Sequence, residues 1–398
     1  SAAPESFLGE LLKRSEARAR NLSSEGQERS ALYGENALLL GVLYREAKQY
    51  EKSAEMLCAA LDTLPGDERP IGEALVRLEG ELPGSAAVKY SVGLASLRLA
   101  HPDKAEARFF QSMERPSAPV EGILGAIGGT SLSLPNANLL AGEALIRSRR
   151  VEEGAAAIRK YIDEEPSAAE GSPLDIAERY RRTASRLAIL PPDVFSQGPV
   201  AFLYAEAAAE LGQMKNAVAA LEASLERDPG AAKTVADWLE RHESQTPTAP
   251  GESLLVRLYA AAGRMDDAVR AGRLAARADQ TAILGIIETI KAAIAPPAER
   301  DGKLVMLLAE LYAQAGDRES AEEALGLLRR SGGVPEEELM RLSGEIMRSC
   351  GSTLTGVVAA VDIAMRRGAT GEAASHFTAY CREHSDELEP LAGELRTP

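Results

Sequence analysis

The sequence predicts an all-α protein built from a repeated array of helices, and three observations support this fold class. Hydrophobic residues make up 45% of the chain but aromatic residues only 4%, which favours many small helix contacts over a β-sheet. Apolar residues recur at helical spacing along most of the 398 residues. A pattern of small residues, aromatics and turn formers also returns along the chain, which is typical of repeat proteins.

The first clear copy of this pattern ends at Pro65. Gly41 lies near the end of one predicted helix, Lys48 marks a tight turn, and Ser53 begins the apolar face of the next helix. Two antiparallel helices approach closely only where their side chains are small, so we expect Gly41 and Ser53 to face each other across the turn. Pro65 is expected to end the second helix.

Six further copies follow this first one. Each has a small residue early in its second helix, and along the chain these residues are Ser53, Ala105, Gly154, Ala217, Ala268, Ala321 and Ala373. Most of the intervals between them are about 50 residues, a period typical of repeat arrays. Two copies end on a proline at the same place in the pattern, Pro166 and Pro229.

These copies resemble the tetratricopeptide repeat family. That family has a small residue in the first helix, Tyr three residues later, Gly at the turn, Ala early in the second helix and a terminal Pro. The resemblance covers about seven helical pairs and implies a right-handed α-helical solenoid. The family repeats about every 34 residues, so a segment of roughly 17 residues is added to each copy here.

The added segments are themselves predicted to be amphipathic helices. Ile71, Leu75 and Leu78 form one apolar stripe, and the segments that begin at Thr281 and Pro335 show the same spacing. A helix with a single apolar stripe buries that stripe against a neighbour. Each repeat is therefore predicted to contain three helices instead of two.

No strong domain boundary interrupts the array. Turn formers are concentrated at residues 191–199 and 242–253. The longest interval between copies spans the first of these segments. We predict two groups of tetratricopeptide-like repeats, residues 1–195 and 196–398, with one continuous superhelix as the alternative.

The charge of the chain limits the classes of partner. A formal net charge of -15 argues against a nucleic-acid binder, which needs a basic surface for the phosphates. Cys58, Cys350 and Cys381 are too widely spaced for a disulfide framework and favour a reducing compartment. No apolar run approaches the roughly 18 residues that span a bilayer. We predict a bacterial protein that is cytoplasmic, or periplasmic if an export signal has been removed.

Sequence motifs for catalysis or metal binding are weak. The glycine-rich segment 122–133 lacks the Gly-Lys-Ser/Thr ending of a phosphate-binding loop and is interpreted as a closely packed helix. His376 and His384 would lie about 12 Å apart along one helix, too far to share an ion. Trp238 is interpreted as a packing residue. We therefore predict a non-enzymatic protein with no cofactor and no metal.

The predicted function is a protein–protein interaction scaffold that binds a protein or peptide partner on its helical-repeat surface. Neither nucleic acid nor a membrane span is expected, and self-association stays open. The alternative is a regulatory or docking part of a larger bacterial protein, or of a secretion or polysaccharide assembly, whose catalytic domain lies elsewhere.

The resemblance also implies a binding surface, because partners of that family lie against outward positions of each first helix. Carried over in motif register, these positions are Arg45, Tyr90, Asn136, Glu143, Arg147, Phe202, Glu206, Arg257, Glu310, Asp362 and Arg366. Adaptors for chaperone tails need Lys and Asn where this sequence has Leu38, Val42, Tyr90 and Leu94, which argues against that subgroup. The added helix leaves open which helix lines the concave face.

Overall fold

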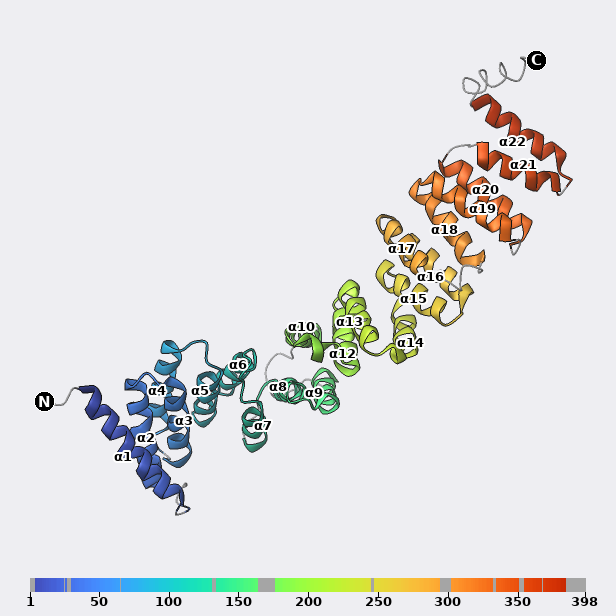
Figure 1. Cartoon of the computed structure of the whole chain (residues 1–398). Coiled ribbons are helices and arrows are strands. Elements are labelled where there is room, and N and C mark those ends of the chain that lie inside the picture. Colours follow the sequence, from blue (N-terminus) through green and yellow to red (C-terminus); the bar gives the residue numbers. More distant parts are fainter. Residues whose placement is uncertain are drawn as a thin grey trace. The chain divides into compact units, whose positions relative to one another are not determined.

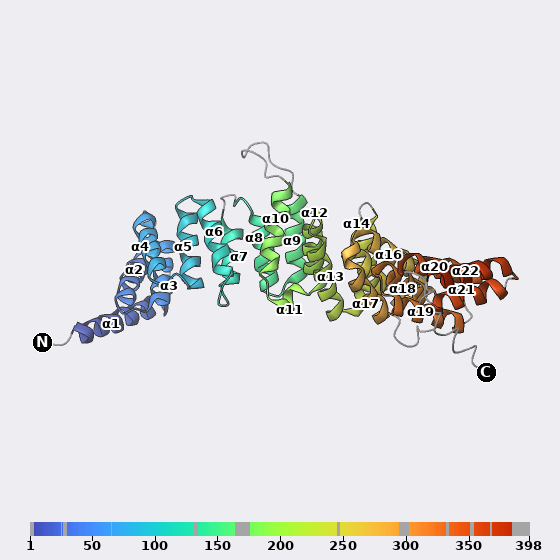
Figure 2. The ribbon, with the colours of Figure 1, turned by 90° about the horizontal axis from the view of Figure 1, so that it is seen from above.

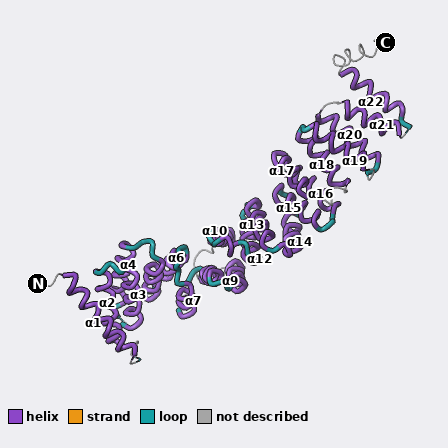
Figure 3. The backbone as a smooth tube through the Cα atoms, in the orientation of Figure 1, coloured by secondary structure: helices purple, strands orange, loops and turns teal. Residues whose placement is uncertain are grey.

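The structure is a computed structural model, and every regular element in the residues that it describes is a helix (Figure 3). It describes residues 4–24, 26, 30–64, 66–130, 134–163, 176–244, 247–293, 302–331, 334–350, 354–366 and 368–383. The predicted all-α class is confirmed over these ranges. Some residues named in the sequence analysis lie outside the described ranges: Pro65, Pro166, His384 and residues 131–133. The side chain of Asp362 is not described either.

The chain forms two compact units, Ser1–Gly212 and Gln213–Pro398. Phe195, where the sequence favours a division, is the last residue of a short helix inside the first unit. The division into domains at residues 195 and 196 stays a prediction.

The first unit contains one long helix, then three groups of three helices, and then two further helices (Figure 1). Its helices are α1 (Pro4–Ser24), α2 (Ala31–Glu46), α3 (Tyr50–Thr63), α4 (Glu68–Glu81), α5 (Ala86–Arg98), α6 (Pro102–Met113), α7 (Val120–Gly129), α8 (Ala137–Arg147), α9 (Val151–Asp163), α10 (Ile176–Ala188), α11 (Pro192–Phe195) and α12 (Gly198–Glu210). In each group the first two helices pair, and the third packs against the first helix of the next group. Within this unit, Figure 2 shows the groups following one another in chain order.

In the second unit, two helices precede groups that have the same order of elements. Its helices are α13 (Met214–Arg227), α14 (Ala232–Glu243), α15 (Ala249–Ala261), α16 (Met265–Ala278), α17 (Ile283–Ala293), α18 (Gly302–Ala315), α19 (Arg318–Ser331), α20 (Glu336–Cys350), α21 (Leu354–Arg366) and α22 (Thr370–Glu383). Here α15 pairs with α16, α18 with α19 and α21 with α22, while α17 and α20 pack on the first helix that follows them. Repeats of three helices are therefore present in both units.

Small residues allow the paired helices to approach closely, as the sequence predicts. The Ser53 hydroxyl of α3 donates a hydrogen bond of 2.7 Å to the Gly41 carbonyl of α2. A Cβ atom on Gly41 would lie 2.8 Å from the side chain of Leu57, so a larger residue does not fit there. Lys48 makes the turn between the two helices with a φ of 57°, in the left-handed region.

The interpretation of Trp238 agrees with the structure, and that of the glycine-rich segment agrees in part. Trp238 is buried in α14 and stacks on His242, with ring centroids 3.8 Å apart. The described part of the glycine-rich segment is helix α7, where Gly122 lies against the ring of Tyr90, but a Cβ atom added to Gly125, Gly128 or Gly129 would meet no atom within 4 Å. None of the described helices has the length and apolar character needed to cross a membrane.

Candidate functional site

The predicted partner-binding residues include a set at one repeated position, six residues before the turn that ends a first helix. These residues are Glu143, Glu206, Arg257, Glu310 and Asp362, and the turn residues, all with positive φ, are Arg149, Gly212, Gly263, Gly316 and Gly368. Five of the eleven predicted residues therefore share one position relative to the turn, whereas the other six lie at other positions. Four of the five side chains are described.

Three of these four side chains form ion pairs with the second helix of the preceding pair. The ion pairs are Arg159 with Glu206, Glu222 with Arg257 at 2.6 Å, and Arg273 with Glu310 at 2.9 Å. The residue on the first helix is acidic, then basic, then acidic in these three repeats. Each pair nevertheless joins a second helix to the first helix of the next repeat. The two more exposed pairs, those of Glu206 and Arg257, contribute only about 0.2–1 kcal/mol each. They connect neighbouring repeats, and their role as partner contacts stays a prediction.

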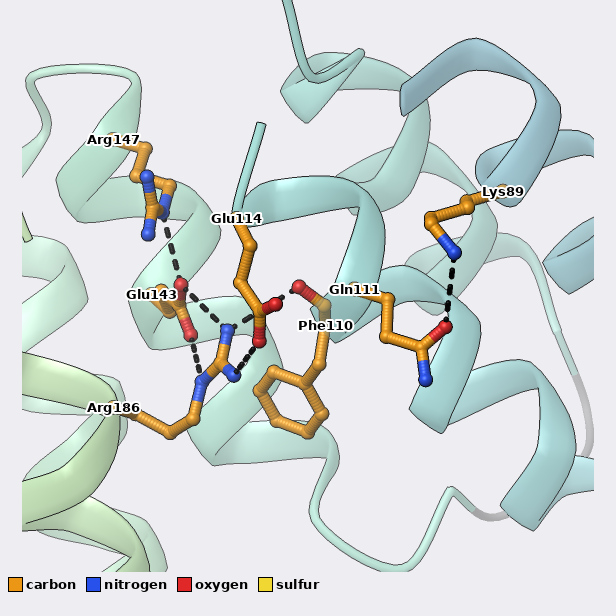
Figure 4. Close-up of polar contacts among 7 residues, drawn as sticks. All are labelled: Lys89, Phe110, Gln111, Glu114, Glu143, Arg147 and Arg186. Atoms are coloured by element: carbon orange, nitrogen blue, oxygen red, sulfur yellow. Dashed lines mark hydrogen bonds and ion pairs between the residues drawn. The ribbon is translucent and has the colours of Figure 1, made fainter. Parts of the chain in front are cut away.

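Glu143 of α8 is the most buried of the set, with no exposed surface. Its carboxylate accepts hydrogen bonds from Arg147 at 2.9 Å and from Nε and Nη2 of Arg186 at 2.8 and 3.0 Å (Figure 4). Arg147 lies on the same helix, whereas Arg186 comes from the third helix, α10. A buried carboxylate needs such partners, because an unpaired buried charge costs several kcal/mol.

Arg186 connects three helices. Besides Glu143 on α8, its guanidinium bonds Glu114 beyond the end of α6 at 2.8 Å and lies 4.5 Å from the ring centroid of Phe110 (Figure 4). Burial opposes the charge of Arg186, but the carboxylates of Glu143 and Glu114 more than offset it and raise its pKa. The contacts fix α10 against the two helices beside it.

The second unit repeats this arrangement around Glu310 of α18. Arg341 of the third helix α20 bonds its carboxylate at 2.7 Å, and Arg273 of α16 bonds it at 2.9 and 3.0 Å. Burial alone would raise the pKa of Glu310, but the hydrogen bonds from Arg273 and Arg341 lower it below its usual value. Glu143 and Glu310 are thus equivalent carboxylates, each held by an arginine of a third helix.

A groove lies beside Glu143 and another lies beside Glu310. Each groove is formed by the second helix of one repeat and by the first and third helices of the next repeat. The groove of the first unit has a volume of about 360 Å³ and is formed by α6, α8 and α10. The groove of the second unit has a volume of about 690 Å³ and is formed by α16, α18 and α20. We call them the first and second grooves. They occupy equivalent places in the order of helices.

The structure brings only some of the predicted residues to these grooves. Asn136 lines the first groove, and Glu310 lines the second. The others lie elsewhere. Arg45 pairs with Glu81 at 2.7 Å, and Tyr90 is half-buried beside Phe109. Phe202 is half-buried on α12, and Arg366 is exposed on α21. Arg147, Glu143, Glu206 and Arg257 have the ion pairs described above.

The arginines of the third helices are the functional candidates that sequence reasoning missed. Arg181, Arg182 and Arg186 line the first groove from α10, and Arg341 lines the second from α20. Glu178, Arg182 and Arg186 follow one another at spacings of four residues, which places them on one helix face. This spacing is the signal that could have found them.

The grooves do not present a metal-binding arrangement. In the described ranges, no three His, Cys, Asp or Glu side chains come close enough to hold a metal ion. What both grooves offer is charged hydrogen-bonding groups on rigid helices, with Phe110 and Leu139 among the apolar residues of the first groove. Such surfaces can bind polar chains.

Comparison with known proteins identifies part of the array. Residues 199–230 match the family model described as tetratricopeptide repeat. The sequence matches none of the curated proteins with which it was compared.

Solved structures with similar folds include three whose TM-scores are low. They are the Cut9–Hcn1 hetero-tetramer of the APC/C (13% identity, 96% of this chain and 95% of that one, TM-score 0.18), the P58(IPK) TPR domain (12%, 92% and 99%, 0.20) and yeast Tom70 (10%, 87% and 91%, 0.16). At these TM-scores the likeness supports no conclusion about function. The matched repeat and the recurring helix pairs show that the chain is a tetratricopeptide-like helical-repeat protein.

Proposed function

We propose that the protein is a non-enzymatic scaffold that binds an extended segment of a partner protein in the grooves beside its third helices. The observation that carries this proposal is the recurrence of the same three-helix groove in both units. Helical-repeat proteins bury their apolar faces between neighbouring repeats and leave long surfaces available for binding. A recurring groove on such a surface suits a chain that extends past several helices.

The size and rigidity of the grooves support this proposal. Their volumes of about 360 and 690 Å³ lie in the range of ligand sites, about 300–1,000 Å³. The ion pairs of Glu143 with Arg186 and of Glu310 with Arg341 hold the helices that form the walls. A preformed site loses less conformational entropy on binding than a mobile one. A few side chains of a bound segment would fill each groove.

Site-specific photo-cross-linking tests the proposal. A benzophenone amino acid replaces Ala107 in the first groove or Gln314 in the second, both of which line these grooves and are exposed. Arg77 of α4 and Ala261 of α15, exposed residues outside both grooves, provide matched controls. Each variant is expressed in cells of the source organism and irradiated, and the cross-linked peptides are sequenced.

We expect one defined protein segment to cross-link at a groove position and not at the control positions. A synthetic peptide of that segment should then compete with the cross-link. Equal labelling at groove and control positions would contradict the proposal. A catalytic turnover that depended on a residue of this chain would also contradict it.

A further inference from the structure

The third helix of the first groove is basic, although the chain as a whole is acidic. Helix α10 carries four arginines and one glutamate, whereas the whole chain has a formal net charge of -15. Arg181, Arg182 and Arg186 line the groove together with Glu178. The groove therefore has one wall whose charge is opposite to that of the protein's average surface.

Two of these arginines are available to a ligand. Arg186 is committed to Glu143 and Glu114. Arg181 and Arg182 both bind the single carboxylate of Glu178, and their side chains are 60% and 41% exposed. One carboxylate therefore serves two guanidinium groups, which leaves a positive charge in excess on this wall. Ion pairs this exposed are weak, about 0.2–1 kcal/mol, so a ligand can replace them at little cost.

The opposite wall has acidic groups of a different kind. Asp103 is exposed in the first turn of α6, while Glu106 is buried and accepts a hydrogen bond of 2.7 Å from the backbone N–H of Asn136. Burial raises the pKa of Glu106, which the hydrogen bonds from Asn136 partly offset. The arginines of α10 attract the carboxylates of an acidic segment, and the acids of α6 repel them. This difference orients such a segment in the groove.

Asn136, one of the residues that line this groove, has an acceptor atom that the protein itself covers. Asn136 is 3% exposed, and its Oδ1 atom has no hydrogen-bond partner among the described residues. Leaving such an atom unpaired costs about 1–3 kcal/mol.

The second groove does not share the basic wall. Its cations Arg277 and Lys303 lie with Asp266 and Glu338 among its lining residues, and Lys303 pairs with Asp266 at 2.6 Å. Its arginines Arg273 and Arg341 are bound to Glu310. Its third helix, α20, carries four glutamates and two arginines, which makes the second groove an internal comparison for the first.

We propose that the first groove selects an acidic segment of a partner protein, with the carboxylates of that segment on Arg181 and Arg182 and an apolar side chain beside Phe110. This inference rests on the proposed scaffold function and adds the chemical class of the partner. The selecting residues lie on the added third helix and not on the first helices where the family resemblance places its binding surface.

The test uses the full chain and a short fluorescent peptide of Glu and Asp residues with one central Leu, whose affinity is measured by fluorescence anisotropy. A peptide with Lys in place of each acid is the counterpart. We expect the acidic peptide to bind at least about tenfold more tightly than the Lys peptide. The double variant Arg181→Glu/Arg182→Glu should weaken its binding at least about tenfold.

The matched control is Arg69→Glu/Arg77→Glu, which makes the same charge change at exposed sites on another third helix, α4. This control should bind the acidic peptide like the parent, and the melting temperature of each variant verifies its fold. Equal loss in both double variants, tighter binding of the Lys peptide or no binding of the acidic peptide would overturn the inference. The cross-linking result would still decide the scaffold function separately, because it does not depend on the charge of the partner.

Discussion

Glu252, at the start of α15, is buried beside a second acid, Glu243 of α14. The carboxylate of Glu243 accepts a hydrogen bond of 2.7 Å from the hydroxyl of Thr248. Glu252 is 4% exposed, and burial together with the charge of Glu243 raises its pKa to about 7, against a smaller opposing effect of Arg270. A carboxyl group with such a pKa opposes folding when it is ionised.

The first prediction is that Glu252→Gln stabilises the protein at neutral and alkaline pH but not at acid pH. In the folded state the pKa of Glu252 is about 7, above its usual value of 4.5. The folded state therefore binds the proton more tightly, and the free energy of unfolding falls as pH rises from about 4.5 to about 7. The Gln variant should be about 1–3 kcal/mol more stable than the parent at pH 8 and similar to it near pH 4.

Urea unfolding followed by the fluorescence of Trp238 measures this effect, because Trp238 is buried on α14, the helix that carries Glu243. Glu288→Gln is the control, since Glu288 is an exposed residue of α17 paired with Lys291. The control should show no pH-dependent gain. A Glu252→Gln variant with the same advantage at both pH values would contradict the assigned titration.

The second prediction concerns the buried pair of Glu143 and Arg186. Replacing Arg186 with Met removes the guanidinium and leaves the Glu143 carboxylate with Arg147 as its remaining ionic partner. We expect this change to cost about 3–5 kcal/mol of stability, as for other buried ion pairs that lose one member. The double variant Glu143→Leu/Arg186→Met should recover part of the loss, because it removes both charges of this pair but leaves Arg147, 14% exposed, without its carboxylate. Urea denaturation followed by circular dichroism tests this, and equal losses in the single and double variants would contradict it.

At the scale of the element, helices α8 and α9 depend on two glycines that face each other. A Cβ atom on Gly154 would lie 2.6 Å from the carbonyl oxygen of Gly142, and one on Gly142 would lie 2.8 Å from the carbonyl oxygen of Gly154. Backbone atoms cannot move aside as a flexible side chain can. The sequence identified Gly154 as the small residue of its helix pair, and the structure supplies the reason.

The third prediction follows from this contact. Gly154→Ala should destabilise the protein by about 1–3 kcal/mol, because the added methyl group forces the two helices apart. The matched control is Gly125→Ala in α7, where an added Cβ meets no atom within 4 Å. That variant should be stabilised by up to about 1 kcal/mol through helix propensity. Thermal unfolding of both variants decides the matter, and equal effects of the two alanines would contradict it.

The elements were predictable because their signals are local in the sequence. Ile71, Leu75 and Leu78, predicted as one buried stripe, are each at most 1% exposed on α4. The grooves were not predictable, since they depend on how each helix is rotated against its neighbours. Arg186 and Glu143 are 43 residues apart in the chain, and no spacing rule connects residues of different helices.

At the scale of the whole molecule, α12 is the element that decides where the first unit ends. Val200 and Leu203 of α12 belong to the same apolar core as Leu187 and Val194 of the preceding helices. The family match over residues 199–230, however, covers the sequence of α12 together with that of α13. The packing of α12 favours an end at Gly212, whereas the sequence favours a division after Phe195.

The fourth prediction compares the fragments 1–195 and 1–212, each expressed alone. Without α12, the shorter fragment exposes the core surface that Val200 and Leu203 cover. Burial of each such side chain contributes about 1.5–3 kcal/mol, so the shorter fragment should be about 3–6 kcal/mol less stable. Urea unfolding of the two fragments, followed by circular dichroism, measures the difference. Equal stability would instead favour a domain boundary at residue 195, because α12 would then contribute nothing to the fold of the helices before it.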